Sequence, residues 1–453
     1  NFESSENHER FTVREAFVQS VNLAFVRLMR DLVRYREARL PYDAARVIDD
    51  PADTLRTRLL GEAADEEALV YLRRAYESLR DVASEDIPAH LIGRGASERK
   101  LAILYLAWHR GTAPDSLADW LRGRGFDTTD EEAQKLVSAY GKPGLSWLDY
   151  AYLLDLHPLE LWCGGELERD SSATWADLAG RSTDVRTECQ QWLFASRHRE
   201  AQNMRLRVRI ERDAFAEMTK DWRRLGFPFS HLVPSYATAI GSSADRPEAL
   251  AELMGTILGD GVNRPSGLIE SLRFGPGTPY ETVLEWQPPR GQRLLSTAVA
   301  GALRRSMIGV VDHGTARRVD NAFAVAGDTL VVGGKTGSGD NRVQAVASNG
   351  ERTSSRATNR TATFVFYVGD RFYGVVTALV LGPRSAEYGF TSALPVEVLR
   401  RMAPEISALY RSDGKAAENA AASPPIQTTA SSSVSRANAA PASPRTPTLV
   451  SGL

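Results

Sequence analysis

The sequence predicts an α/β fold that includes a large all-α segment and ends in a disordered tail. Three observations predict it. Apolar residues at helical spacing dominate the first half of the 453-residue chain. Apolar runs of strand length gather between residues 330 and 381. From residue 412 onward, Ala, Ser, Pro and Thr replace the large apolar residues that a core needs.

Helices account for the N-terminal half. Residues 11–35 have a helical apolar pattern, which predicts one helix or two helices separated near Ser20-Val21-Asn22. Residues 40–226 are rich in Leu, Ala, Glu and Arg, with Pro or Gly at the expected breaks, and strand-like alternation is scarce. Most of the tryptophans lie in this segment, so we expect it to have its own core.

Helices and strands alternate after residue 227. The pattern predicts a helix that begins at Pro247 and ends near Gly259, and a second helix that Gly314 closes. Three strands should follow, the last two joined as a hairpin through Asp370-Arg371, and then a final helix. The predicted strands are 330–337, 361–369 and 372–381, the final helix is 395–410, and the disordered tail is 412–453.

The segment LVVGGKTGSGDN, residues 330–341, contains the sharpest local signal. Lys335 places a positive charge where a substrate carboxylate could bind, and Thr336 and Ser338 add hydroxyl groups beside it. Gly337 leaves a strand edge open for an extended peptide to pair alongside. The alternative is an ordinary strand that ends in a glycine turn with a solvated lysine.

A second signal is Ser20-Val21-Asn22, which places a hydroxyl and a carboxamide two residues apart. Such a pair can relay a proton and hold an amide. The alternative is a helix N-cap, because Ser and Asn favour that position.

The two signals occur in the order found in active-site serine acyl-transfer enzymes, which carry SxxK, then SxN or SDN, then KTG. Their surroundings narrow the match. The stretches NFESSENHERFTVREAFVQSVNLAFVRL, LVPSYATAIGSSADRPEALAELMGTILGDGV, GVVDHGTARRV and GGKTGS resemble the transpeptidase portion of class A penicillin-binding proteins, which are bifunctional peptidoglycan glycosyltransferase/transpeptidases. The resemblance covers about 1–35 and 227–410, so the helical segment would be an insertion. It divides the chain into 1–39 and 227–411 as transpeptidase, 40–226 as insert and 412–453 as tail.

The resemblance implies a penicillin-binding/β-lactamase-like fold with a central antiparallel sheet flanked by helices. The KTG strand would lie at the edge of the sheet, with Ser20 facing it from a helical lobe. The nucleophile would be the serine of SxxK, which in this family precedes the Asn-aromatic segment that here starts at Asn1. We therefore expect the nucleophile and any membrane anchor upstream of this chain, and this chain alone to be inactive.

The implied activity is a serine-type D-Ala-D-Ala transpeptidase that cross-links stem peptides and is acylated by β-lactams. Ser20 would relay a proton, Asn22 would hold the donor amide, and Lys335 would attract the terminal carboxylate. Thr336, Gly337 and Ser338 would bind substrate, with the Ser338 N–H as half of the oxyanion hole. The expected location is the bacterial periplasm, at the outer face of the cytoplasmic membrane. The insert is a candidate contact surface for cell-wall machinery proteins.

The remaining motifs give weaker evidence of function. Ser97-Glu98-Arg99-Lys100 spells SxxK but follows SxN, so we interpret it as a chance match. The arginines of 197–212 indicate a solvated helix face or, as the alternative, an anionic surface contact.

Cys163 and Cys189 are two buried thiols or one disulfide. Histidines and cysteines show no metal-ligand spacing, and the net charge of −2 lacks a basic excess, so we expect no metal, no cofactor and no nucleic-acid partner.

Two other functions stay open. A class A β-lactamase or D,D-carboxypeptidase shares the motif order, but SVN in place of SDN and the long gap between Ser20 and Lys335 argue against the lactamase. A non-catalytic penicillin-binding-like scaffold, or binding module of the cell-wall synthesis machinery, would keep the site as a relic and use the helical segment for protein contacts.

Overall fold

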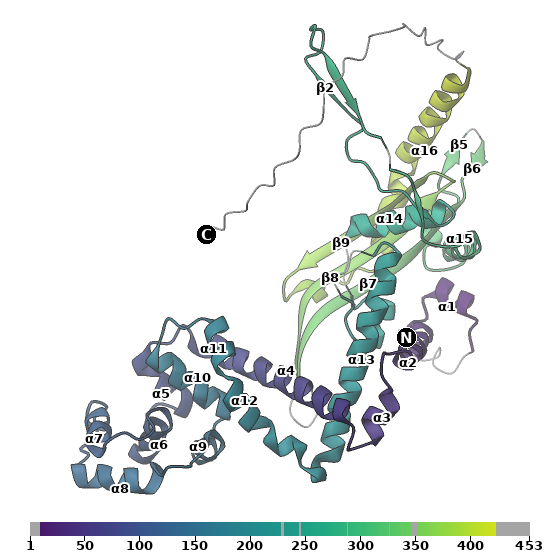
Figure 1. Ribbon diagram of the computed structural model, residues 1–453. Helices are drawn as coiled ribbons and strands as arrows, with labels where there is room; N and C mark the ends of the chain where they lie inside the picture. The colour runs from purple at the N-terminus through teal and green to yellow at the C-terminus, as the bar shows by residue number, and fades with distance from the viewer. Residues whose placement is uncertain are drawn as a thin grey trace, which may run out of the picture.

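The computed structural model describes six stretches of the chain, namely 10–227, 231–243, 246–287, 289–325, 327–346 and 352–422. Figure 1 shows a part built around a β-sheet and a separate cluster of helices, connected by the long helix α13. Within the described residues no helix combines the length and apolarity needed to cross a bilayer.

Two helices begin the described chain, α1 (Val13–Gln19) and α2 (Asn22–Glu37). Thr12 caps α1 in a reciprocal capping box with Glu15, whose carboxylate accepts from the Thr12 backbone N–H at 2.8 Å. The α1 helix ends at Ser20, which adopts a left-handed conformation with φ 58°. The two-helix alternative is therefore confirmed, with the break where the sequence predicted it.

Residues 40–226 form only helices, as predicted. A buried cluster that includes Trp108 and Trp162, with Trp120, Trp147 and Trp175 packed against it, gives the distal helices their own core. The helices are α3 (Ala44–Asp49), α4 (Thr54–Leu79), η2 (Ser84–Asp86), α5 (Ile87–Ile92), α6 (Glu98–Trp108), α7 (Pro114–Arg122), α8 (Asp130–Tyr140), α9 (Trp147–Leu154), α10 (Pro158–Arg169), α11 (Trp175–Arg181), α12 (Thr183–Gln190), η3 (Gln191–Phe194), η4 (Ser196–His198) and α13 (Arg199–Arg224).

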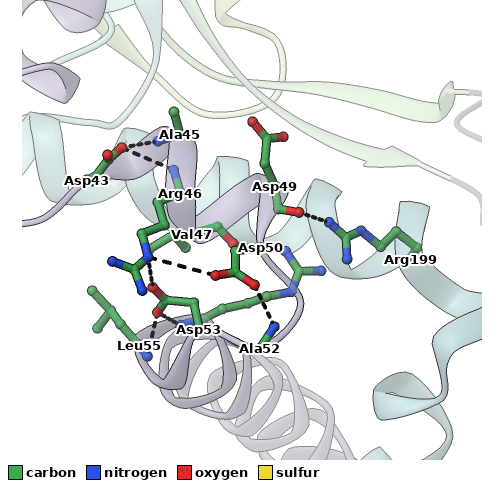
Figure 2. A network of polar contacts seen from close by, with 11 residues as sticks. Asp43, Ala45, Arg46, Val47, Asp49, Asp50, Ala52, Asp53, Leu55 and Arg199 are labelled. Atoms are coloured by element: carbon green, nitrogen blue, oxygen red, sulfur yellow. Dashed lines mark hydrogen bonds and ion pairs between the residues drawn. The ribbon is translucent and has the colours of Figure 1, made fainter.

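Polar contacts fix the entry into the helical segment (Figure 2). Asp43 caps α3 by accepting from two backbone N–H groups, and Asp53 caps α4 in the same way. Arg46 joins the two caps through an ion pair with Asp53 at 3.0 Å. From α13, Arg199 donates to the Asp49 carbonyl at 2.6 Å, so three helices meet in one hydrogen-bonded corner.

The sheet that carries the KTG triplet has three antiparallel strands in the order β7-β8-β9, so β7 lies at an edge. Side chains alternate between its two faces. Phe364 and Phe366 join a core with α16, and Val365 and Tyr367 join another with α14. The elements are α14 (Pro247–Leu258), α15 (Thr297–Asp312), β7 (Val332–Val346), β8 (Arg352–Val368), β9 (Phe372–Leu381) and α16 (Ala393–Ala422).

The predictions for this part agree with the structure in element type and order. The α14 helix begins at Pro247, α15 ends just before Gly314, and β8 and β9 form the predicted hairpin. The first two strands are much longer than predicted. The α16 helix continues to Ala422, so it enters the segment that we expected to be disordered from residue 412, while 423–453 lie outside the described residues.

Short elements complete the fold, and most of them were not predicted from the sequence. The β2–β3 hairpin projects away from the body in Figure 1, and all of its strand residues are exposed. These elements are η5 (Tyr236–Ile240), β1 (Val262–Asn263), β2 (Ser271–Phe274), β3 (Thr282–Glu285), β4 (Gln292–Arg293), η6 (Arg317–Val319), β5 (Ala324–Val325), β6 (Asp328–Thr329) and η7 (Ser385–Tyr388).

Candidate active site

The β7 strand reaches Lys335 through two glycines that the packing requires. A Cβ atom on Gly333 would lie 2.5 Å from the Tyr367 ring, and one on Gly334 would lie 2.5 Å from the Val365 carbonyl oxygen. Any side chain at either position would push β7 away from β8. The glycines therefore hold the backbone before Lys335 in a close and fixed position.

The turn between α1 and α2 presents Ser20. A left-handed backbone is unusual for a residue other than glycine, and such strain persists only where the surroundings enforce it. Here the Val21 N–H donates to the Ala16 carbonyl at 2.9 Å, which closes the turn. On its other side, Gly314 lets the loop after α15 approach, because a Cβ there would lie 2.5 Å from the Val18 carbonyl oxygen.

The structure brings Ser20 and Lys335 together although 315 positions separate them. The Lys335 ammonium donates a short hydrogen bond to the Ser20 hydroxyl and a second one to the Thr336 carbonyl at 3.1 Å. Its nitrogen lies 5.6 Å from the centre of the Phe17 ring, within range of a cation–π contact. The two sequence signals thus form one cluster.

This ammonium lacks an anionic partner among the described residues, where none of the ion pairs includes Lys335. Burial lowers the pKa of Lys335 to about 8, because a desolvated site disfavours the charged form. A desolvated cation held by neutral groups is a suitable site for an anion that arrives from outside.

The next residues of β7 differ in accessibility. Thr336 is buried, 9% exposed, and its hydroxyl lies 2.6 Å from the hydroxyl of Thr315. Gly337 is exposed, and a Cβ there would meet nothing within 4 Å, so space remains beside the strand as predicted. The exposed Ser338 hydroxyl accepts a hydrogen bond at 2.7 Å from the backbone N–H of Ser392, just before α16.

Asn22 is the first residue of α2 and is partly exposed, two residues beyond Ser20. Neither Ser20 nor Asn22 is the N-cap of α2, since that position belongs to Val21, which makes no side-chain capping bond. The N-cap alternative is therefore wrong for both residues. The roles of Asn22, Thr336 and Ser338 toward a substrate stay predictions.

Sequence reasoning missed two residues of this cluster. Phe17 borders Lys335, and Thr315 is bonded to Thr336. Both lie in stretches that carried the family resemblance, the helix before SxN and the GTA triplet. Their types alone gave no reason to choose them, since a phenylalanine in a helix and a threonine after a helix are common.

The other motifs have structural roles. Ser97 caps α6 by accepting from the Lys100 backbone N–H at 3.4 Å, which agrees with a chance SxxK match. The arginines on α13 pair with acidic residues of α4, as Arg205 does with Glu67 at 2.8 Å and Arg209 with Glu62 at 2.9 Å. These pairs are internal contacts between helices, which neither of our two expectations for the arginines described.

Cys163 and Cys189 are free thiols, and burial raises the pKa of each to about 12. A search of the described residues for groups of His, Cys, Asp and Glu that could hold a metal ion finds none.

No protein-family model matches the chain, and no curated protein matches it. Among solved structures it is similar to penicillin-binding protein 3 from Mycobacterium tuberculosis complexed with aztreonam, at 19% identity over 45% of this chain and 48% of the other, with a TM-score of 0.30. It is also similar to the ceftriaxone acyl-enzyme complex of penicillin-binding protein A from the same organism, at 19% identity over 43% and 45%, with a TM-score of 0.30.

A third similar structure is the D,D-transpeptidase domain of a peptidoglycan glycosyltransferase from Eggerthella lenta, at 18% identity over 45% of this chain and 51% of the other, with a TM-score of 0.29. The matched region spans about half the length of each of these three proteins. TM-scores of this size do not define a common fold, so the function proposed below depends on the motifs and on the geometry of the cluster.

Proposed function

We propose that this chain is the D,D-transpeptidase portion of a penicillin-binding peptidoglycan synthase. The observation that carries the proposal is the hydrogen bond between Lys335 of KTG and Ser20 of SxN. Chance seldom places two motifs of one family in contact across 315 positions. The proposed location is the outer face of the bacterial cytoplasmic membrane, where the peptidoglycan substrate lies.

The proposed substrate is a stem peptide that ends in D-Ala-D-Ala. Its terminal carboxylate would bind the Lys335 ammonium, which has no carboxylate partner within the described part of the chain. The peptide backbone would pair beside the open position at Gly337, and the exposed Ser338 would supply a hydroxyl. Asn22, partly exposed at the start of α2, would hold the amide of the donor peptide.

The proposed reaction is acyl transfer through a serine that the family's motif order places before this chain. Its hydroxyl oxygen would bond to the carbonyl carbon between the two D-alanines, and the Ser338 N–H would stabilise the resulting oxyanion. A general base, for which the SxxK lysine is the family's candidate, would take the proton of that serine hydroxyl. The carbon–nitrogen bond would then break, and the same proton would reach the amine of the leaving D-alanine through the Ser20 hydroxyl. An amine on a neighbouring strand would attack the acyl group and release the serine.

Ser20 and Lys335 suit this proton relay. The Ser20 hydroxyl accepts from the Lys335 ammonium, so its own proton points away from Lys335 and can be donated to the leaving amine, while Lys335 keeps its charge for the carboxylate. Burial lowers the pKa of Lys335 to about 8, so the ammonium is still mostly charged at neutral pH, as carboxylate binding requires.

Labelling with a fluorescent penicillin tests the proposal. This chain alone should remain unlabelled, whereas a protein extended by the natural sequence before Asn1 should form a stable adduct. Lys335→Ala in the extended protein should reduce the rate of acylation by roughly a hundredfold or more, because a desolvated cation is lost. An adduct on any residue of this chain, or unchanged acylation of the Lys335→Ala variant, would refute the proposed site. An extended protein that never reacts but binds peptide would favour the scaffold.

A further inference from the structure

Thr315 lies at a junction between the two halves of the candidate site. The preceding residue, Gly314, is in close contact with the Val18 carbonyl, two residues before Ser20. The following residue, Ala316, is fully buried, and its N–H donates to the Val310 carbonyl at 2.9 Å. Thr315 itself is exposed. Two fixed neighbours therefore hold an accessible hydroxyl in a defined place.

Thr336 connects this hydroxyl to Lys335. The Thr336 carbonyl accepts from the Lys335 ammonium at 3.1 Å, and its hydroxyl lies 2.6 Å from that of Thr315. The Thr336 side chain is buried and has only this one hydrogen bond within the described residues. A single residue therefore contacts both the cation and the exposed hydroxyl.

The direction of the hydrogen bond between the two hydroxyls follows from their surroundings. Only one of them can donate to the other, and a buried hydroxyl that donates to nothing loses a hydrogen bond. The Thr336 hydroxyl therefore donates to the Thr315 oxygen, and the Thr315 hydroxyl can donate its own proton to solvent or to a ligand. Ser338 is in the same situation as Thr315, because its hydroxyl oxygen accepts from the Ser392 N–H and its proton has no acceptor among the described residues.

We propose that Thr315 is a ligand-contacting residue that donates a hydrogen bond to the carboxylate bound by Lys335, while Thr336 acts as a positioning residue behind it. The inference rests on the proposed function. It differs from the expected division of roles, in which Thr336 contacted the substrate directly and Thr315 had no role. The carboxylate would then accept from the Lys335 ammonium and from the hydroxyls of Thr315 and Ser338.

Binding of two synthetic peptides to the whole chain tests the inference. One ends in D-alanyl-D-alanine with a free carboxylate, and the other has the same sequence with a C-terminal amide. Calorimetry or NMR titration should show that Thr315→Val weakens binding of the carboxylate peptide roughly tenfold, as expected for a hydrogen bond to a charged group. Thr315→Ser, which keeps the hydroxyl, should bind close to wild type.

Two further measurements separate a direct contact from a structural effect. Thr315→Val should change binding of the amide peptide little, because that peptide lacks the charged acceptor. Thr336→Val should also weaken binding of the carboxylate peptide, and the double variant should lose no more than Thr315→Val alone, since the two residues act in series. Thr57→Val, at an exposed site on α4, is the matched control and should leave binding unchanged.

The outcomes distinguish this inference from the proposed function. Suppose that the wild-type chain binds the carboxylate peptide and that Lys335→Ala abolishes this binding. If Thr315→Val does not alter binding, then Thr315 has no such role and the proposed function stands. Equal losses for the carboxylate and amide peptides would also overturn the inference. If the wild-type chain shows no binding that depends on Lys335, the proposed function and the inference both fail.

Discussion

The helical segment 40–226 and the Ser20–Lys335 site differ in the range of the contacts that form them. In the helical segment, capping residues lie next to the helices that they cap, as Ser146 does for α9 and Thr174 for α11. In the site, the contacts that bring the separate segments together join residues far apart in the sequence, such as Lys335 with Ser20 and Ser338 with Ser392. Local sequence therefore specifies where the helices of the first region begin, whereas tertiary packing specifies the site.

The difference predicts that damage to the helical core leaves the site intact. Trp108 is 4% exposed, and its indole N–H donates to the Leu161 carbonyl at 2.8 Å. Trp108→Ala should cost about 3–5 kcal/mol of local stability, because it opens a cavity and removes that hydrogen bond. Hydrogen exchange should show faster exchange in α6 and α10, while peptide binding at Lys335 stays unchanged.

The exposed Trp192, 45% accessible, provides the control. Trp192→Ala should cost much less stability. Loss of peptide binding in Trp108→Ala, with the sheet still folded, would contradict the independence of the two regions.

The converse prediction concerns Gly314, which allows the loop after α15 to approach the Ser20 turn. Gly314→Ala should cost about 1–3 kcal/mol and weaken peptide binding, because a Cβ there would overlap the Val18 carbonyl oxygen. Gly180→Ala on α11 is the matched control, because nothing lies within 4 Å of the added atom. It should stabilise α11 by about 1 kcal/mol. Chemical denaturation and titration with the peptide measure both effects, and equal behaviour of the two variants would refute the close approach.

The pH dependence of peptide binding reports the charge of Lys335 in the site. Binding needs the charged ammonium, so affinity should be full below pH 8 and fall by up to about tenfold for each pH unit above it. The stability of the folded chain should change with pH in the opposite direction to the peptide affinity. The folded pKa of Lys335 lies below the ordinary value of 10.5, so the unfolded chain binds more protons between pH 8 and 10.5 and folding gains stability as pH rises through that window. Lys335→Arg should remove both dependences, and a flat affinity between pH 7 and 10 in the wild type would contradict them.

The smallest expected effect is that of Ser97, the false SxxK match. Ser97→Ala should cost about 1 kcal/mol, because it removes the cap of α6, and should not change peptide binding. Thermal unfolding and titration with the peptide check this. A loss of binding would show that this motif contributes to the site after all.

The sequence predicted those parts of the fold that periodicity and local residue types determine. The break at Ser20 and the start of α14 at Pro247 agree with the structure, and so does the edge position of β7, which the family resemblance implied. The full length of β7 and β8 could not be predicted, because residues 338–346 and 352–360 are polar and lack a strand-like apolar pattern. Their pairing with each other, which is non-local, makes them strands.

The candidate site was predicted only in part, because some of its contacts are also non-local. Lys335 and Ser20 were found because their motifs are short and occur in a fixed order. Thr315 was missed, and only Thr336 was expected to bind substrate, because the packing of the loop after α15 against β7 decides which of the two threonines is exposed. The pairing of α13 arginines with α4 likewise depends on how two helices cross.

NMR titration of Lys335 tests most directly whether Ser20 and Lys335 form one site. Lysine labelled with ¹³C at Cε would report the charge of each side chain, and Lys335→Ala would assign the signal. The structure predicts that Lys335 titrates with a pKa of about 8. Ser20→Ala should lower this pKa further, because the ammonium loses a hydrogen-bond acceptor. A pKa near 10.5 that is insensitive to Ser20→Ala would mean a solvated lysine without contact to Ser20, and would contradict the site.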